Sequence, residues 1–314
     1  MLANEEGTQE TAESAPHKRS PGAKPAQQAV RTIGKGMRNT LAVGVLLLVT
    51  RILAPAEDPR QIVRRSTEED RRSAKLAENY TFIERLDERS LDSQGRTSHR
   101  DVKSYDVTLT EGSPYRRLIA RDDKPLPPNE ERKEQQKLEK NIAERRAETP
   151  AQREKRLADW RRTRAKDREF LLEVPDAFDF RQVGEETVDG RRVWVIDATP
   201  RPGYRPKSIV GRFLPKLKGR LWIDEETYAW VKAEAQTTDT VSFGGIALRY
   251  SPGARFSLQQ VRVNNEIWLP KRISVTGQAR LLLFKKFSGT VDFTYSDYKK
   301  FQTDSRIVAT EEAH

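Results

Sequence analysis

The sequence contains no cysteine. This absence excludes disulfides, thiolate metal sites, cysteine nucleophiles and a lipid-modified N-terminal cysteine. Histidine is scarce as well, because the three in the chain, His17, His99 and His314, lie far apart in the sequence. Carboxylates are abundant, but where 33% of residues are charged we expect them to lie on solvated surface. The sequence therefore predicts a protein that is not an enzyme, with no catalytic residues, no metal ligands and no cofactor.

Apolar residues are also few for a chain of 314 residues, at 35%, so part of the chain must be solvated rather than core. The formal charge is +11, and the first 56 residues contribute little to it, with seven Lys/Arg and four Asp/Glu. A basic surface of this size is compatible with anionic lipid, cell-wall polymer or nucleic acid. Export of the protein, which the next observation indicates, makes nucleic acid the poorest of these partners.

A secretory signal peptide is predicted over residues 37–56. Basic residues surround Met37, the apolar run Leu41–Val49 follows, and Ala54-Pro55-Ala56 ends the segment. A basic start, a short apolar stretch and an Ala-x-Ala end are the three parts of such a signal. The alternative, a transmembrane anchor, needs roughly 20 apolar residues, and Arg51 interrupts this run. We therefore expect cleavage after Ala56 and a mature protein in the periplasm.

Two terminal segments are expected to lie outside the folded domain. Residues 1–36 are rich in Glu, Ala, Pro, Gln and Ser, and they lack any apolar period. They are predicted to be a disordered tail, or to precede a true translation start at Met37. Residues 303–314 are also predicted to be a disordered tail. The domain itself should span residues 57–302.

Two longer helical regions are predicted, in addition to a short helix through Ile209, Phe213 and Leu214. Asp58-Pro59 is typical of a helix start, and the apolar stripe that follows it is thin, so this helix is expected on a surface. Residues 129–172 form a charged helical insertion, which a capping pattern of Thr149, Pro150 and Gln152 divides into two helices. Because the insertion holds few apolar residues and nearly balanced charge, it is predicted to be a solvated, projecting hairpin.

The rest of the chain alternates apolar and polar residues with turn residues about every ten positions, which predicts an antiparallel meander. Asp189-Gly190 is the clearest turn signal. So many successive strands must curl or split into two sheets. The predicted strands are 80–86, 102–109, 116–120, 180–183, 193–198, 219–224, 228–237, 246–250, 254–263, 266–277, 278–284 and 289–298.

The apolar sides of these strands are the candidate binding surface. An apolar concave face needs a cover, and the predicted helices are few and poorly amphipathic, which leaves room for a ligand. Ordinary core packing is the alternative for each residue of this surface. The residues concerned are Val107, Leu221, Ile223, Val231, Ile273, Val275, Val291, Phe293 and Tyr295.

Several short segments resemble LolA-type proteins. Gly219–Thr227 followed by Trp230–Glu234 resembles a strand–turn–strand in which an apolar strand ends in Asp. Asn264–Pro270 is similar to a later hairpin of the same family, and Val188–Val195 to an earlier one. The resemblance covers about residues 58–300 and is interrupted by the charged insertion. It indicates a divergent branch of these periplasmic lipid and lipoprotein carriers.

This resemblance implies an α+β, mostly β fold: an open, strongly curved antiparallel half-barrel with covering helices. It also implies outer membrane lipoprotein sorting or lipid transport, in which the sheet holds the acyl chains of a lipid or lipidated protein. Some relatives sense envelope stress instead, so the alternative is a sensor or scaffold that binds an envelope protein through the charged helices. No match is found for the cavity arginine with which the lipoprotein carrier holds its helices shut, so that mechanism is not transferred.

Four lysines near the last predicted strands bear on contact with membranes. They are expected to steer a carrier to anionic headgroups, which would give peripheral contact with an anionic membrane. Solubilising surface charge is the alternative. The four are Lys285, Lys286, Lys299 and Lys300.

Overall fold

The computed structural model describes residues 57–243, 248–281, 285–301 and 307–308. The chain divides into two units, residues 1–53 and 54–314, and the fold below is that of the second. The predicted signal peptide and N-terminal tail lie outside the described residues, as does most of the predicted C-terminal tail. Within the described ranges, every helix is too short or too polar to cross a membrane.

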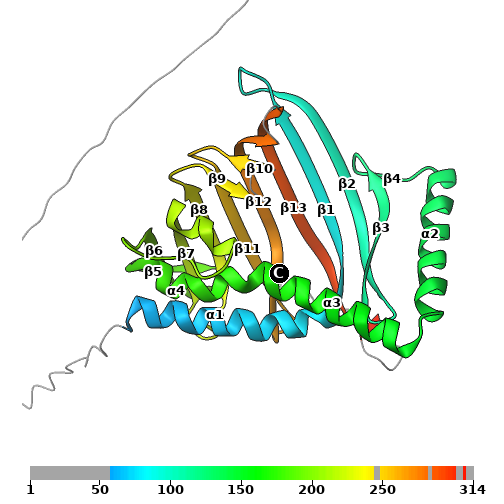
Figure 1. The fold of residues 1–314 in the computed structure, drawn as a ribbon, viewed down its shortest axis with the longest axis horizontal. Coiled ribbons are helices and arrows are strands. Elements are labelled where there is room, and N and C mark those ends of the chain that lie inside the picture. Colours follow the sequence, from blue (N-terminus) through cyan, green and yellow to red (C-terminus); the bar gives the residue numbers. More distant parts are fainter. Residues whose placement is uncertain (1–56, 244–247, 282–284, 302–306, 309–314) are drawn as a thin grey trace, which may run out of the picture. The chain divides into compact units, whose positions relative to one another are not determined.

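One antiparallel sheet dominates the fold (Figure 1). Its strands run in the order β4-β3-β2-β1-β13-β12-β11-β8-β7-β6-β5, with β9, β10 and β14 attached beside this path. Within the described residues the end strands β4 and β5 do not pair with each other, so the sheet stays open. The predicted fold class, an open curved antiparallel sheet with covering helices, is confirmed. The strand bounds are β1 Tyr80–Leu91, β2 Thr97–Thr110, β3 Ser113–Arg121, β4 Lys124–Pro125, β5 Phe178–Val188, β6 Arg191–Pro200, β7 Leu217–Asp224, β8 Trp230–Thr237, β9 Val241–Phe243, β10 Leu248–Tyr250, β11 Arg255–Val263, β12 Ile267–Leu281, β13 Lys285–Phe301 and β14 Ile307–Val308.

Two glycines, Gly190 and Gly277, have different roles in the sheet. In the β5–β6 turn, Asp189 and Gly190 have φ of 48° and 76°, which a tight hairpin turn requires, so the predicted hairpin is confirmed. The predicted strand break after Gly277 is wrong, because β12 continues through this residue. A side chain at Gly277 would bring its Cβ to 2.7 Å from the Cβ of Ala254, so this glycine permits close packing rather than a turn.

The predicted helices are present. The helical segments are α1 Pro59–Leu76, α2 Pro128–Arg146, α3 Pro150–Arg168 and α4 Val174–Ala177, with 3-10 turns η1 Ala77–Asn79, η2 Glu169–Glu173 and η3 Val210–Lys216. At the start of α3 the backbone N–H of Gln152 donates to Thr149 Oγ1 at 3.3 Å. The backbone N–H of Thr149 donates in return to Gln152 Oε1 at 2.9 Å. The capping box that was predicted to divide the insertion is thus confirmed.

The charged hairpin does not project into solvent as predicted. Figure 1 shows α1 and α3 crossing in front of the sheet, with α2 beside β3. Polar contacts hold the hairpin: Arg145 donates to the carbonyls of Thr110 and Ser113, both at 2.9 Å, and Arg156 donates to Ser113 Oγ at 2.6 Å. The spacing of apolar residues in the sequence gives no information about such polar contacts, so it predicts a solvated hairpin.

The core packs on both faces of the sheet at β6–β8. On the face toward α1, here called the inner face, Ile62 and Val63 are fully buried and pack against Ile196 and Ile223. Burying each of these side chains contributes roughly 1.5–3 kcal/mol. This anchors α1, so it is more than the surface helix that was predicted. A second cluster, on the outer face, includes Trp222.

Candidate functional site

The inner face carries apolar rows that cross the sheet. Residues paired across neighbouring antiparallel strands point to the same side. Such pairing links Leu221 on β7 to Ala233 on β8, and Leu258 on β11 to Ile273 on β12 and then to Phe293 on β13. Together they form one continuous row, with Ala233 and Leu258 paired at its centre. The row gives the sheet an apolar lining that runs well beyond the part covered by α1.

An apolar pocket of about 450 Å³ lies over this lining. Strands β7, β8, β11 and β12 form its floor, and η2, α4 and η3 supply further walls. The volume falls within the roughly 300–1,000 Å³ that is typical of small-molecule sites. Its apolar lining residues are Phe170, Leu171, Val174, Phe178, Ala198, Phe213, Leu214, Leu217, Leu221, Trp230, Ala233, Ala235, Val241, Phe256, Leu258, Pro270 and Ile273.

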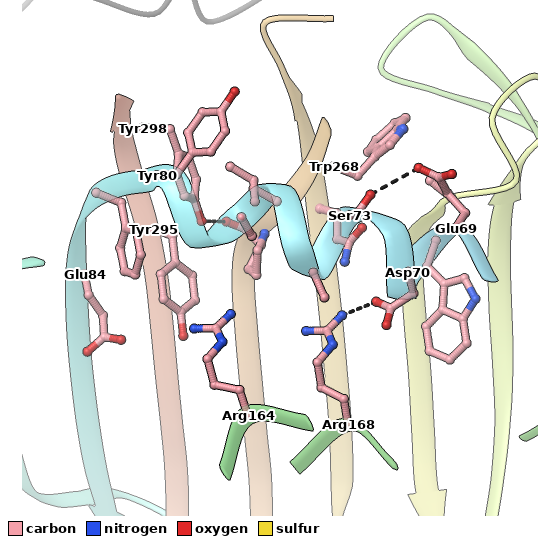
Figure 2. A pocket seen from close by; sticks show the side chains of 18 residues that line it. Glu69, Asp70, Ser73, Tyr80, Glu84, Arg164, Arg168, Trp268, Tyr295 and Tyr298 are labelled. Atoms are coloured by element: carbon pink, nitrogen blue, oxygen red, sulfur yellow. Dashed lines mark hydrogen bonds and ion pairs between the residues drawn. The ribbon is translucent and has the colours of Figure 1, made fainter. Parts of the chain in front are cut away.

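A second pocket of about 250 Å³, here called the tyrosine pocket, is drawn in Figure 2 and adjoins the first. Tyr80, Tyr295 and Tyr298 line it together with charged side chains from α1 and α3. Burial raises the pKa of Tyr295 and of Tyr298, so both phenols stay neutral. The two pockets share five lining residues: Asp70, Arg168, Trp230, Gln260 and Pro270.

The shared charged residues form an ion pair between the two pockets. Arg168 on α3 donates to Asp70 on α1, as the dashed line in Figure 2 shows. The Nε atom of Arg168 is buried and has no hydrogen-bond partner in the described part of the chain. A buried donor without an acceptor costs free energy.

Arg164 lies one turn earlier on α3 and projects into the tyrosine pocket (Figure 2). Its guanidinium lies 5.5 Å from the ring of Trp160, and among the described residues it forms no ion pair or hydrogen bond. Burial lowers the pKa of Arg164, and the neighbouring charge of Arg168 lowers it further. The guanidinium nevertheless stays charged, because arginine is not deprotonated in proteins.

Each acidic side chain of the tyrosine pocket forms an ion pair, although Glu84 Oε1 is buried without a hydrogen-bond partner in the described part of the chain. Glu69 accepts from Arg72 Nε at 2.9 Å, Asp70 pairs with Arg168, and Glu84 pairs with Arg116 on β3. None of these carboxylates pairs with Arg164 within the described residues. The charges of Glu78 and Asp167 attract Arg164, but neither forms an ion pair with it within the described residues, so among the cations that line this pocket Arg164 lacks an ion-pair partner.

Eight of the nine residues predicted to contact a ligand lie on the inner face. Leu221 and Ile273 line the apolar pocket, and Tyr295 lines the tyrosine pocket. Ile223 is fully buried beneath α1 and Val107 is 8% exposed, so both belong to the packed core. Val275, Val291 and Phe293 are partly exposed on the same face, as their cross-strand pairs show. That any of these residues contacts a ligand stays a prediction.

The ninth residue, Val231, lies on the opposite face, which corrects its predicted placement. It packs with Trp222 in the outer cluster. The β7–β8 register shifts here, because Trp222 pairs with Lys232 whereas Ile223 pairs with Trp230. Val231 is the extra residue of this bulge, and a bulge breaks the alternation of sides on which the prediction relied.

The sequence pattern missed the residues that helices bring to the pockets. Phe170, Arg164 and Arg168 lie in segments whose apolar content predicts no buried face, whereas Phe213 lies in the predicted short helix, which the structure contains as η3. One signal was available: Arg164 and Arg168 are four residues apart, so they share a helix face and repel each other.

The structure says little about the four lysines that are expected to steer the protein to anionic headgroups. Lys300 pairs with Glu266 at 2.8 Å, and the side chains of Lys285 and Lys286 lie outside the described residues. Lys299 is exposed.

No family model and no curated protein matches the sequence. Among solved structures, a putative outer membrane lipoprotein-sorting protein domain from Vibrio parahaemolyticus is 11% identical, with a TM-score of 0.31; the match covers 78% of this chain and 95% of that one. A LolA superfamily protein from Nitrosomonas europaea is 14% identical, with a TM-score of 0.28 and coverage of 78% and 93%. The MucA/MucB complex of Pseudomonas aeruginosa contains a chain that is 13% identical, with a TM-score of 0.22 and coverage of 79% and 99%.

Two of these neighbours are described as an outer membrane lipoprotein-sorting domain and a LolA superfamily protein, and the sequence motifs resemble LolA-type proteins. The class that the fold defines is an open curved antiparallel sheet with helices across one face. The backbones superpose loosely at these scores, so the function has to be inferred from the chain's own residues.

Proposed function

We propose that this protein is a periplasmic carrier that holds the acyl chain of a lipid or lipidated protein against the inner face of its sheet. The observation that supports the proposal is the apolar pocket of about 450 Å³ between the sheet and the helical segments. The charged side chains that line it, among them Asp70, Arg168 and Lys218, leave the floor apolar. Such a site favours a long apolar chain over a compact polar metabolite.

Burial of apolar surface supplies the binding free energy at roughly 25 cal/mol per Å². Each additional methylene that is buried adds about 0.8 kcal/mol, so affinity should rise steeply with chain length until the pocket is full. Polar contacts at the edge of the pocket would then set which headgroup is accepted. No covalent step is required, which is consistent with a carrier rather than an enzyme.

The direct test is to purify the full-length protein from a bacterial envelope without detergent and to analyse extracted lipid by mass spectrometry. We expect acyl lipid in stoichiometric amount. Protein that is free of lipid, and that also fails to bind 1-palmitoylglycerol when it is added, would overturn the proposal.

A variant pair distinguishes pocket binding from adhesion to the outside of the protein. Ala233→Trp places an indole in the centre of the apolar row and should reduce lipid uptake at least fivefold. Gln259→Trp places the same group on β11, where the side chain is exposed and points away from the row, and it should leave uptake unchanged. Thermal unfolding of both variants establishes that they are folded. Equal uptake by the two variants would contradict binding in the pocket.

The alternative function is a scaffold or sensor that binds an envelope protein through the charged helices. Its support is α2, in which every residue is at least partly exposed, so the helix keeps a free charged surface. Deleting the whole hairpin would not separate the two functions, because α3 lines the tyrosine pocket. Charge reversal at exposed Lys133 and Lys140 is the sharper test, since it should abolish partner binding and leave lipid uptake intact.

A further inference from the structure

The two pockets are chemically different and adjoin each other. The apolar pocket is lined mainly by aliphatic and aromatic side chains, whereas the tyrosine pocket contains hydroxyl groups and charges. The Asp70–Arg168 pair, together with Trp230, belongs to the lining of both. A molecule with an apolar tail and a polar head therefore has a place for each part, with the boundary at this ion pair.

Three hydrogen-bond donors in the tyrosine pocket lack an acceptor among the described residues. Arg164 forms no ion pair, the Tyr295 hydroxyl forms no hydrogen bond, and Arg168 Nε is buried without a partner. Figure 2 shows Arg164, Arg168 and Tyr295 all projecting into this pocket. Two of the three donors belong to cations, and Glu69, Glu84 and Glu78 pair with other arginines, so Asp167 is the carboxylate near Arg164 that has no ion pair within the described residues.

An oxyanion would satisfy this arrangement. Arg164 and Arg168 are four residues apart on one helix face, so their charges repel, and the repulsion is relieved when an anion lies between or beside them. Guanidinium groups bind phosphate and carboxylate oxygens with charge-assisted hydrogen bonds, which are about twice as strong as neutral ones. A phenol that stays neutral adds a third donor of suitable type.

We propose that the tyrosine pocket binds the anionic headgroup of an acyl-chain amphiphile, with Arg164 as the principal contact and Tyr295 and Arg168 as further donors. The inference rests on the proposed function, because it places the acyl chain of the same ligand in the apolar pocket. It adds a selectivity that the apolar pocket alone cannot supply: an anionic lipid is preferred to a neutral lipid with the same tail.

Two probes that differ only in the headgroup test this selectivity. 1-Palmitoyl lysophosphatidic acid and 1-palmitoylglycerol share the acyl chain and glycerol, and only the first has a phosphate. We expect the full-length protein to bind the phosphate-bearing probe about tenfold tighter or more, because hydrogen bonds to charged groups contribute more than neutral ones. Calorimetric titration below the micelle concentration of each probe measures the two affinities.

Variants on α3 assign the selectivity to one residue. Arg164→Gln should reduce the preference to less than twofold by weakening the phosphate probe alone, and Arg164→Lys should retain part of it. Arg162→Gln is the matched control, because Arg162 lies on the same helix, is 69% exposed and pairs with Asp159. It should keep the full preference. Melting temperatures within a few degrees of the unmodified protein show that the variants remain folded.

The outcomes separate this inference from the proposed function. If the unmodified protein binds both probes equally, or if Arg164→Gln weakens both equally, the headgroup site is wrong and the carrier function stands. If neither probe binds, both proposals are wrong. If inorganic phosphate alone binds as tightly as the phosphate-bearing lipid, the pocket takes a free anion rather than a lipid headgroup, and the inference is again overturned.

Discussion

Arg168 on α3 and Asp70 on α1 form an ion pair at the boundary of the two pockets, so one contact both joins the helices and separates two chemical environments. Their side chains are 38% and 17% exposed, so the pair is only partly screened by water. A ligand whose tail and head occupy different pockets would lie across this contact. The pair is therefore expected to control exchange more than equilibrium affinity.

The first prediction concerns that exchange. Asp70→Asn should accelerate the release of bound 1-palmitoylglycerol about fivefold to tenfold, because one charge-assisted contact between α1 and α3 is weakened. Stopped-flow transfer of the lipid to excess vesicles measures the release rate. Asp159→Asn is the matched control, since it weakens an exposed ion pair within α3 alone. A release rate that is equal in the two variants would show that the Asp70–Arg168 contact does not limit exchange.

The second prediction separates the two faces of the sheet. Val231→Ala should lower the free energy of unfolding by about 1–3 kcal/mol without changing lipid affinity, because Val231 packs in the outer cluster. Ile273→Ala should lower lipid affinity without changing the free energy of unfolding, since Ile273 is only partly buried and lines the apolar pocket. Urea unfolding and lipid titration on both variants measure the two quantities. Loss of lipid affinity in the Val231 variant would contradict the assigned face.

The strand pattern predicted much of this architecture because alternation reports directly which side of a strand is apolar. Phe293 and Ile273 were placed together on this basis, and they pair across β12 and β13. The pattern failed at Val231, because a bulge adds one residue and nothing in the alternation marks it. A bulge is a property of two paired strands rather than of one, so single-strand periodicity does not reveal it.

The helical side of the site was harder to predict for a different reason. Phe170 reaches the apolar pocket from the 3-10 turn η2, which is too brief to show a period, whereas the short helix that carries Phe213 was expected but not its contact with the pocket. Arg164 and Arg168 lie in a helix that has no fully buried residue, and the helix is held by hydrogen bonds and ion pairs. The hydrophobic pattern of the strands predicts the floor of the site, but it does not predict the charged side chains that α1 and α3 bring to it.

The third prediction concerns the carboxylate that organises the helical wall. Glu173 is 4% exposed and accepts from the backbone N–H groups of Lys207 and Ser208 at 2.7 and 2.9 Å, and also from the hydroxyls of Ser208 and Tyr204. Its oxygens fill the space beside Gly211, where a Cβ would come within 2.5 Å of Oε1. The side chain therefore holds η3 against η2, and both turns line the apolar pocket.

Glu173→Gln replaces one acceptor oxygen by an amide group that can only donate. This should lower the free energy of unfolding by about 1–3 kcal/mol, because at least one of the donors is left without an acceptor. Lipid affinity should fall as well, since the wall of the pocket loosens. Glu169→Gln, an exposed position in the same turn, is the control and should change neither quantity. If the Glu173 variant unfolds at the same urea concentration as the unmodified protein, the carboxylate does not have this role.

The fourth prediction concerns acid stability and begins with Asp224, which is fully buried at the end of β7. It accepts from Arg191 Nε and Nη2 at 2.6 and 2.9 Å, and from the backbone N–H and hydroxyl of Thr227 at 2.8 and 2.7 Å. Burial by itself raises the pKa of Asp224, but the hydrogen bonds from Arg191 and Thr227 outweigh it. The pKa in the folded protein therefore lies below the ordinary value of 3.8.

A pKa that is lower in the folded state means that Asp224 stabilises the protein fully at pH values well above 3.8. As the pH falls through 3.8, the unfolded chain binds a proton first, and this stabilisation is lost until the folded carboxyl is protonated too. We expect Asp224→Asn to be less stable at pH 7 and to lose less of its melting temperature between about pH 5 and pH 3 than the unmodified protein. Asp189→Asn is the control, because Asp189 is exposed in the neighbouring turn and asparagine tolerates its positive φ. A melting temperature that falls as steeply in the Asp224 variant as in the Asp189 control would show that the acid sensitivity arises at other carboxylates.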